Sequence, residues 1–581
     1  MKNNLVFFKL KSNKTLFQTL LFLVVVFFIS SLSLFLSFIL KNLNPLEYGL
    51  IQGEKGDLEI TYKEILFFAS IVLCFFLLSL SYRYIKKRHL KLILISTASV
   101  YLFAAAFIVL VDSVYYLIFA YRITFSAVQT ILNTNQEEVR GFIKLYYSPG
   151  RIIALLVFVI FIFLVIYNWT RFIALFSTGS FFIISLVLTV FGIIDFGQMA
   201  HSNGNGPHNV RYWDIIIGEY NEYNEFNRRL KVEKSKYGFS SEYDDFYKKD
   251  TLTKTLVFVI SESLSKRHMS LYGYPRSTTP NLDSNKSIFK FNDCVSEAAF
   301  TSEAVPGLFF KGHLAKRINL ITLLNKLGYE TSWISNQSGW GKGDRSIVLL
   351  SQLCKQTTFM EQMADNDKAN SSLHYDESVL EQFEKTLSKS SKASKFIVLH
   401  FMGCHFEYEK RYPSNRNFFK SPAPAKVALN TEQIQKNINS YDNAMRYHDS
   451  IVNEVVRIFS KHSQNQNSAL VFLSDHGEEL YENRDHAGHG YPPCKATAEI
   501  PYFAALSPDF KKNYPEVKEV MQRRKNTPYS ATNNFYTLID LLKIDSKKYH
   551  TRIFKNSFLS PAYDSTGTRL VMGIDYSTMN L

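Results

Sequence analysis

The chain has 581 residues, a formal net charge of +15 and 46% hydrophobic residues. A chain of this length is expected to hold at least two structural units. Long Phe-rich apolar runs lie before residue 200, and the remainder has the mixed composition of a soluble domain. Much of the positive charge lies in short segments between the apolar runs, which argues against nucleic-acid binding.

Five apolar runs are long enough to cross a bilayer as helices, since about 20 residues suffice. They cover residues 16–40, 64–82, 92–118, 152–170 and 172–196. The first run is long and further runs follow it, which argues against a cleaved signal peptide. We therefore expect a membrane domain of five transmembrane helices within residues 1–197.

Lysines and arginines in the short loops predict the orientation of these helices. Four lysines precede the first run and residues 83–91 are strongly basic, so both segments should be cytoplasmic. An odd number of spans then places the chain after residue 197 outside the cytoplasm. Residues 198–250 are expected to form a linker with a short bridging helix, and residues 251–581 a separate domain.

Strand-like runs alternate with helical patterns in this last region, which predicts an α/β sandwich around a mostly parallel sheet. The expected strands cover 255–262, 329–335, 395–402, 468–475, 501–506 and 569–574. The expected helices include 317–327, 376–388 and 431–460. In such a sheet, the functional site lies at the carboxyl ends of the strands.

Two of the expected strands end on groups that bind divalent cations. One run stops at Glu262, and another ends on the adjacent pair Asp475 and His476. Neighbouring parallel strands would bring these side chains to one cation. Either run alone is equally typical of a strand that leads into a capped loop, so the metal site rests on both together.

Three further histidines are interpreted as structural. His400 ends an expected strand and fits a hydrogen-bonded core histidine better than a ligand. His268 and His448 are expected at surface or structural positions.

Thr301 is the candidate nucleophile. A threonine hydroxyl is unreactive at neutral pH unless a base or a cation stabilises its alkoxide. The alternative is that Thr301 caps a helix with Glu303 in its first turn. Both descriptions can hold together, because backbone N–H groups at a helix N-terminus also bind phosphate.

Four of the five cysteines follow the last apolar run: Cys294, Cys354, Cys404 and Cys494. In an exported domain they permit two disulfides with three possible pairings, or they stay as four buried thiols. The sequence does not choose between these alternatives.

Several motifs occur together in this part of the chain. They are LVFVISESLSKRHMSLYGYPRSTTP at 256–280, the Thr301 segment, VLHFMGCH at 398–405 and LSDHGE at 473–478. Together they resemble the phosphoethanolamine transferases, inner-membrane enzymes of the alkaline phosphatase/sulfatase superfamily. The resemblance covers nearly the whole chain and implies a multi-pass inner-membrane protein with a periplasmic catalytic domain of the alkaline phosphatase/sulfatase type.

The resemblance also implies roles for individual residues. Zinc, as one or two ions, would be held by Glu262, Thr301, Asp475 and His476, with Thr301 as the nucleophile that becomes modified. His405 and His489 match histidines that bind substrate phosphate or a second zinc. The other matches to substrate-binding residues are Lys342, Asn135 and Glu138.

Three residues next to these positions are not assigned to the site itself. His486 is an alternative match for His489. Glu478 and Glu479 are expected to be solvated or helix-capping, with a contact to His476 as the alternative for Glu478.

The implied reaction transfers phosphoethanolamine from phosphatidylethanolamine to a lipopolysaccharide acceptor, on lipid A or a core sugar, or to another glycan. The Tyr-Gly-Tyr-Pro-Arg run at 272–276 and the few cysteines look more like the subgroup that modifies core sugars. A rival is a phosphoglycerol transferase of the lipoteichoic acid synthase or glucan-modifying type. An inactive membrane scaffold is a second rival, which the complete set of zinc ligands argues against.

Overall fold

The computed structural model describes part of the chain in detail. The described residues are 86–90, 93, 228, 231, 243–311, 318–337, 345–360, 375–424, 431–482, 487–490 and 493–579. Almost all of them belong to one of the two compact units of the chain, the unit that contains Glu222–Leu581. The predicted spans and most of the predicted linker lie outside these residues. Within the described residues, no helix is both long enough and apolar enough to cross a membrane.

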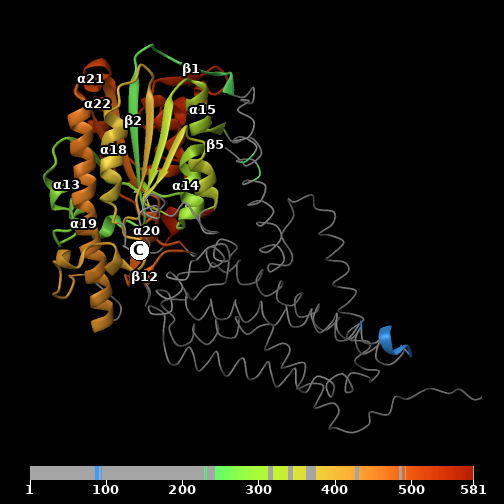
Figure 1. Cartoon of the computed structure of the whole chain (residues 1–581), viewed down its shortest axis with the longest axis vertical. Helices are drawn as coiled ribbons and strands as arrows, with labels where there is room; N and C mark the ends of the chain where they lie inside the picture. The colour runs from blue at the N-terminus through green and yellow to red at the C-terminus, as the bar shows by residue number, and fades with distance from the viewer. Residues whose placement is uncertain are drawn as a thin grey trace, which may run out of the picture. The chain divides into compact units, whose positions relative to one another are not determined.

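A seven-stranded sheet forms the centre of the domain, in the order β3-β13-β10-β2-β9-β7-β8. Strands β10, β2, β9, β7 and β8 run parallel, whereas β13 and β3 are antiparallel to their neighbours. The strands are β2 (Lys254–Ser261), β3 (Ile288–Phe291), β7 (Glu330–Ser335), β8 (Gln356–Phe359), β9 (Lys395–His400), β10 (Asn467–Ser474) and β13 (Tyr502–Leu506). Figure 1 shows this sheet between helices on both faces.

Helices cover both faces of the sheet, as the alternation in sequence predicted. On one face lie α14 (Thr301–Phe309), α15 (Leu320–Lys326), α16 (Arg345–Ser351), α21 (Pro508–Asn513), α22 (Pro515–Arg523), α23 (Asn534–Leu541) and α24 (His550–Asn556). On the other lie α13 (Pro280–Ser284), α18 (Ser378–Ser388) and α19 (Glu432–His462).

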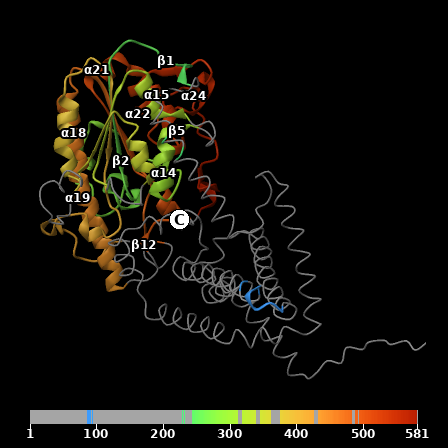
Figure 2. The ribbon, with the colours of Figure 1, turned by 45° about the vertical axis from the view of Figure 1, so that its right-hand side comes forward.

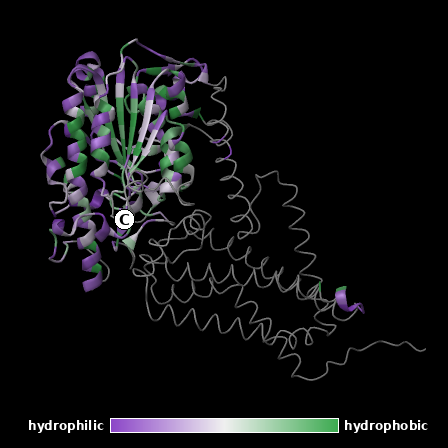
Figure 3. Ribbon diagram, viewed as in Figure 1, coloured by the Kyte–Doolittle hydropathy of each residue, from purple (hydrophilic) through white to green (hydrophobic). Residues whose placement is uncertain are grey.

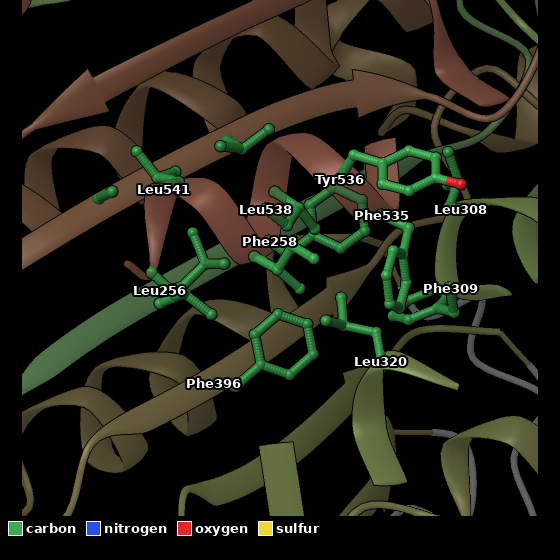
Figure 4. Packing of buried hydrophobic residues seen from close by; sticks show 14 of the residues in the cluster. Leu256, Phe258, Leu308, Phe309, Leu320, Phe396, Phe535, Tyr536, Leu538 and Leu541 are labelled. Atoms are coloured by element: carbon green, nitrogen blue, oxygen red, sulfur yellow. The ribbon is translucent and has the colours of Figure 1, made fainter. Parts of the chain in front are cut away.

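A hydrophobic core lies on each face of the sheet, and the central strand β2 contributes side chains to both. Its residues are all buried, and successive side chains of a strand point to opposite faces. Phe258 therefore packs with Phe309 of α14 and lies beside Leu538 of α23 (Figure 4), whereas Val257 and Val259 join the core under α18 and α19. Figure 3 shows hydrophobic residues along the central strands and hydrophilic residues on the outer sides of the helices. A strand buried on both faces needs a nearly continuous apolar run, which this segment provides.

The predicted strands of the main sheet are confirmed for five of the six runs. The run at 569–574 is wrong as a sheet strand, since β16 (Leu570–Val571) and β17 (Ile574–Asp575) pair only with each other. Strands β3 and β8 were not predicted, because both are short edge strands with mixed polarity. The predicted helices are confirmed with shifted ends as α15, α18 and α19.

Short pairs of strands, one short α-helix and several 3-10 helices lie outside the main sheet and its covering helices. The strand pairs and the short helix are β1 (Phe246–Lys248) with β15 (Ile544–Ser546), β4 (Cys294–Val295) with β14 (Tyr529–Ser530), β5 (Phe310–Lys311) with β6 (Ile318–Asn319), β11 (Glu479–Leu480) with β12 (Ala487–Gly488), and α20 (Lys495–Ala498). Strand β1 lies at the end of the domain where β2 begins (Figure 2).

Candidate active site

Strands β2 and β10 bring the two predicted ligand groups together. The strands pair in parallel with Ser261 opposite Ser474, so Glu262 and Asp475 leave the sheet side by side. The backbone N–H of Asp475 donates to the Ser261 carbonyl over 2.9 Å. The sheet therefore continues one step beyond the strands and fixes both carboxylates at its carboxyl edge.

Glu262, Asp475 and His476 form a compact group of possible metal ligands. Their ligand atoms all lie within 4.8 Å of one another, and the three residues are buried. The Asp475 Oδ2 atom is buried and accepts no hydrogen bond from the described residues. A buried carboxylate oxygen without a donor is costly, and a cation would satisfy it. This set of donors, two carboxylates and an imidazole, suits zinc.

The electrostatics of His476 agree with a ligand role. Burial lowers the pKa of His476, although the Asp475 carboxylate acts in the opposite direction. The neutral imidazole is the form that binds a metal. His476 Nδ1 lies 2.8 Å from the Gly477 carbonyl oxygen, which orients the ring with Nε2 available.

Thr301 lies directly beside this group. Its Oγ1 is 3.1 Å from Glu262 Oε1 and 3.2 Å from His476 Nε2. Helix α14 begins at Thr301, whose side chain is partly exposed. The positive end of a helix favours negative charge, so this position suits both an alkoxide and a substrate phosphate.

The expectation that Thr301 is the N-cap residue of its helix is wrong by one position. Phe300, in extended conformation, is the N-cap of α14, and no side chain forms a capping hydrogen bond there. Glu303 does lie in the first turn. Thr301 is thus the first helical residue. Its hydroxyl contacts Glu262 and His476 and does not cap the helix.

Two histidines extend the site from other loops. His405 Nε2 lies 3.2 Å from Glu262 Oε1. The His489 ring centroid is 4.2 Å from that of His476 and 6.2 Å from that of His405. His476, Glu478 and His489 form a second group of possible metal ligands.

The prediction that Glu478 and Glu479 are solvated or helix-capping is wrong, because both are fully buried. Glu478 Oε1 accepts a hydrogen bond from the Tyr408 hydroxyl over 2.5 Å, and Oε2 lies 2.7 Å from His489 Nδ1. Glu478 therefore orients His489 toward the site. Glu479 lies in β11, with its Oε2 3.6 Å from Cys494 Sγ.

Gln337 and Asp376 are two polar residues at the site that the sequence did not reveal. The Gln337 amide donates to Glu262 Oε2. Asp376 accepts the backbone N–H groups of Met402 and Gly403 over 2.9 and 2.8 Å, and so fixes the turn that carries His405. Gln337 follows β7 by two residues, so the rule about strand ends could have found it.

The three histidines that were interpreted as structural do have structural positions. His400 is buried, with Nδ1 3.3 Å from Ser335 Oγ, and burial lowers its pKa to about 4. His448 Nε2 lies 2.7 Å from Ser261 Oγ. His268 Nδ1 lies 2.8 Å from Asp442 Oδ1.

The four cysteines of this domain are buried thiols: Cys294, Cys354, Cys404 and Cys494. The structure therefore supports the second of the two alternatives. The predicted residues Lys342, Asn135, Glu138 and His486 lie outside the described residues.

A family model and a curated protein both match this chain. Residues 254–544, half of the chain, match the family model described as Sulfatase. The chain is similar to phosphoethanolamine transferase EptC of Escherichia coli (strain K12), with 25% identity over 500 residues that cover 80% of this chain and 83% of EptC.

Solved structures resemble the same domain. The crystal structure of the C-terminal periplasmic domain of EcEptC from Escherichia coli in complex with Zn has a TM-score of 0.52 and 27% identity, covering 58% of this chain and 96% of that one. The integral membrane protein lipooligosaccharide phosphoethanolamine transferase A (EptA) from Neisseria meningitidis has a TM-score of 0.55 and 18% identity, covering 84% of this chain and 97% of that one. This second likeness bears on the fold alone.

Proposed function

Because this chain belongs to the sulfatase family, we propose that it transfers phosphoethanolamine from phosphatidylethanolamine to a lipopolysaccharide acceptor, on lipid A or a core sugar. The observation that carries this proposal is the Thr301 hydroxyl, 3.1 Å from Glu262 Oε1 and 3.2 Å from His476 Nε2. A partly exposed hydroxyl at a helix N-terminus beside buried metal-type ligands suits covalent phosphoryl transfer. The similarity to EptC identifies the group that is transferred.

The metal in this proposal is zinc, as one or two ions. Glu262, Asp475 and His476, together with Thr301, would hold the first ion, and the group of His476, Glu478 and His489 offers a second position. Bound zinc supplies Lewis acidity, which lowers the cost of a threonine alkoxide.

In the first half-reaction, Thr301 Oγ1 attacks the phosphorus of the donor phosphodiester. A new Oγ1–P bond forms, the bond from phosphorus to the glycerol oxygen breaks, and diacylglycerol leaves. The Thr301 proton passes along its hydrogen bond to Glu262 Oε1. His489, whose Nδ1 lies 2.7 Å from Glu478 Oε2, donates a proton to the leaving oxygen.

In the second half-reaction, an acceptor oxygen attacks the phosphorus of phospho-Thr301. The Oγ1–P bond breaks, and Thr301 regains its proton from Glu262. Burial lowers the pKa of His405 well below its usual range, with Arg411 and two histidines acting in the same direction. A neutral His405 takes the acceptor proton, and passing this proton on to His489 restores both histidines for the next turnover.

The lipid donor accounts for the apolar first part of the chain. We propose that residues 1–197 form five transmembrane helices in the inner membrane and that the domain from residue 251 lies in the periplasm. Lys342, Asn135 and Glu138 remain proposed substrate contacts.

The proposal is tested by mass spectrometry of the full-length protein purified from membranes that contain phosphatidylethanolamine. We expect an added mass of about 123 Da, the phosphoethanolamine group of a covalent intermediate. The adduct should map to the peptide that contains Thr301 and be absent from Thr301→Ala.

Two results would contradict the proposal. A phosphoglycerol adduct on Thr301 would place the chain with the phosphoglycerol transferases. An adduct-free protein, with Thr301→Ala supporting normal ethanolamine modification of lipopolysaccharide, would remove Thr301 from the reaction.

A further inference from the structure

Residues 414–424, hereafter the aromatic loop, expose a large hydrophobic side chain. Phe418 is 51% exposed to solvent. Arg416 and Lys420, two positions before and after it, are also exposed. The aromatic loop contains no aspartate or glutamate. Its surface therefore combines an aromatic ring with positive charge.

The loop is held in place by a buried side chain. Asn443 of α19 is 1% exposed, and its Oδ1 accepts the backbone N–H groups of Phe418 and Phe419 over 2.9 and 2.8 Å. Its Nδ2 donates to Asn417 Oδ1 over 2.7 Å. A buried amide that uses both of its ends fixes the loop conformation. The exposure of Phe418 is thus part of an ordered arrangement.

Two arginines surround the aromatic pair. The Arg446 guanidinium carbon lies 4.6 Å from the centre of the Phe418 ring, and the Arg276 guanidinium carbon lies 4.8 Å from that of Phe419. Arg276 also donates to the fully buried Asp442 over 2.7 Å. These contacts keep positive charge next to the exposed ring.

Helix α19 places the loop at the end of the domain that carries the active site. Tyr441, two residues before Asn443, donates to the Ser263 carbonyl over 2.6 Å and accepts the N–H of Ser265 over 2.7 Å. Ser263 directly follows Glu262 in the chain, and Ser265 lies two positions further on. The aromatic loop and the carboxyl edge of the sheet thus meet the same turn of α19.

We infer that the aromatic loop docks on the surface of a bilayer that contains anionic lipid, with Phe418 in the interface and Arg416, Lys420 and Arg446 against lipid phosphates. An aromatic ring flanked by basic side chains favours the boundary between headgroups and acyl chains. The inference rests on the proposed function, in which the donor is a lipid that stays in the bilayer. Docking would hold Thr301 near the surface where that lipid lies.

The test places a fluorescent reporter in the loop. Phe418→Trp is introduced into the full-length protein, which is reconstituted in vesicles of phosphatidylethanolamine and phosphatidylglycerol brominated on their acyl chains. The signal of the parent protein is subtracted. We expect the added tryptophan to lose about half or more of its emission, because bromine quenches a tryptophan only when the ring inserts close to the brominated acyl chains.

A matched control comes from the opposite end of the domain. Phe554 is 42% exposed on α24, which lies beside β1 (Figure 2). Phe554→Trp should show little quenching. In the Arg416→Gln, Lys420→Gln double variant of Phe418→Trp, the quenching should weaken in vesicles with phosphatidylglycerol.

Equal quenching at positions 418 and 554, or none at 418, would overturn the inference. A tryptophan at 418 that is quenched only after lipopolysaccharide is added would assign the loop to the acceptor instead. The quenching does not require transfer activity, whereas the Thr301 adduct does not require Phe418. Failure of the docking can therefore be told apart from failure of the proposed reaction.

Discussion

Side chains from three different segments contact Glu262. Thr301 Oγ1 and His405 Nε2 lie 3.1 and 3.2 Å from its Oε1, and the Gln337 amide donates to its Oε2. The carboxylate thus connects the proposed nucleophile to a histidine. Replacing Glu262 with glutamine removes the negative charge of the side chain and keeps its shape.

Glu262→Gln should lower the transfer rate by about 100-fold or more, because the amide neither accepts the Thr301 proton nor binds zinc well. The unfolding temperature of the metal-free protein should stay the same or rise, since one buried charge is removed. Transfer assays, zinc content and thermal unfolding check both parts. Glu384→Gln, at an exposed ion pair with Lys461, is the control and should stay active. Normal activity in Glu262→Gln would exclude the proposed role.

His268 makes the stability depend on pH. Burial by itself would lower the pKa of His268, but the Asp442 carboxylate and Glu482 raise it to about 9. The folded state therefore binds a proton more tightly than the unfolded state, whose histidine titrates near 6.5. This contribution, on the order of 3 kcal/mol, should be fully present below pH 6.5 and lost as the pH rises through about 9.

Thermal unfolding of the wild type and of His268→Gln at pH 6, 7.5 and 9 checks this prediction. The variant should be less stable at pH 6 and show a smaller decline toward pH 9. An identical decline in both proteins would assign the pH dependence to other groups.

At the scale of the elements, the turn after β9 depends on a close approach of two backbones. Gly403 has φ +54°, and a Cβ added there would lie 2.4 Å from the Glu262 carbonyl oxygen and 2.8 Å from its nitrogen. The N–H of Cys404 donates to the same carbonyl over 3.0 Å. The turn between β9 and His405 therefore packs directly against the residue that carries the site's carboxylate.

Gly403→Ala should disturb this turn and lower the transfer rate by about tenfold or more, because neither backbone can give way without moving Glu262 or His405. Gly328→Ala is the matched control. Gly328 has φ +81° with no atom within 4 Å of an added Cβ, so this variant carries the backbone strain without the contact. It should lose about 1 kcal/mol of stability and keep its activity. Equal loss of activity in both variants would contradict the argument.

At the scale of the whole molecule, the proposed zinc site joins β2, β10 and α14, which are far apart in sequence. A ligand that binds only the folded state stabilises it in proportion to the logarithm of its concentration. Metal binding at this junction should therefore stabilise the catalytic domain as a unit.

A chelator should abolish transfer and lower the unfolding temperature, and added zinc should restore both. Magnesium should not replace zinc, since a site with an imidazole ligand suits the softer ion. The unfolding temperature of Glu262→Gln should change little when the chelator is added, because this variant binds zinc weakly. Full activity after the removal of metal, verified by elemental analysis, would refute zinc dependence.

The sequence by itself determined the central strands, the α/β class and the positions of Glu262, Asp475 and His476. Runs buried on both faces must be apolar, and such runs are visible in a sequence. The short edge strands β3 and β8 lack this signal, because their burial is incomplete and their residues are mixed.

Only the tertiary structure decided which polar residues are buried and what they contact. Glu478 resembles a surface charge in the sequence, yet it is buried between Tyr408 and His489, 70 and 11 positions away. Gln337 reaches Glu262 across 75 positions. A polar side chain is buried only when distant segments supply its hydrogen bonds, and local sequence does not contain those partners.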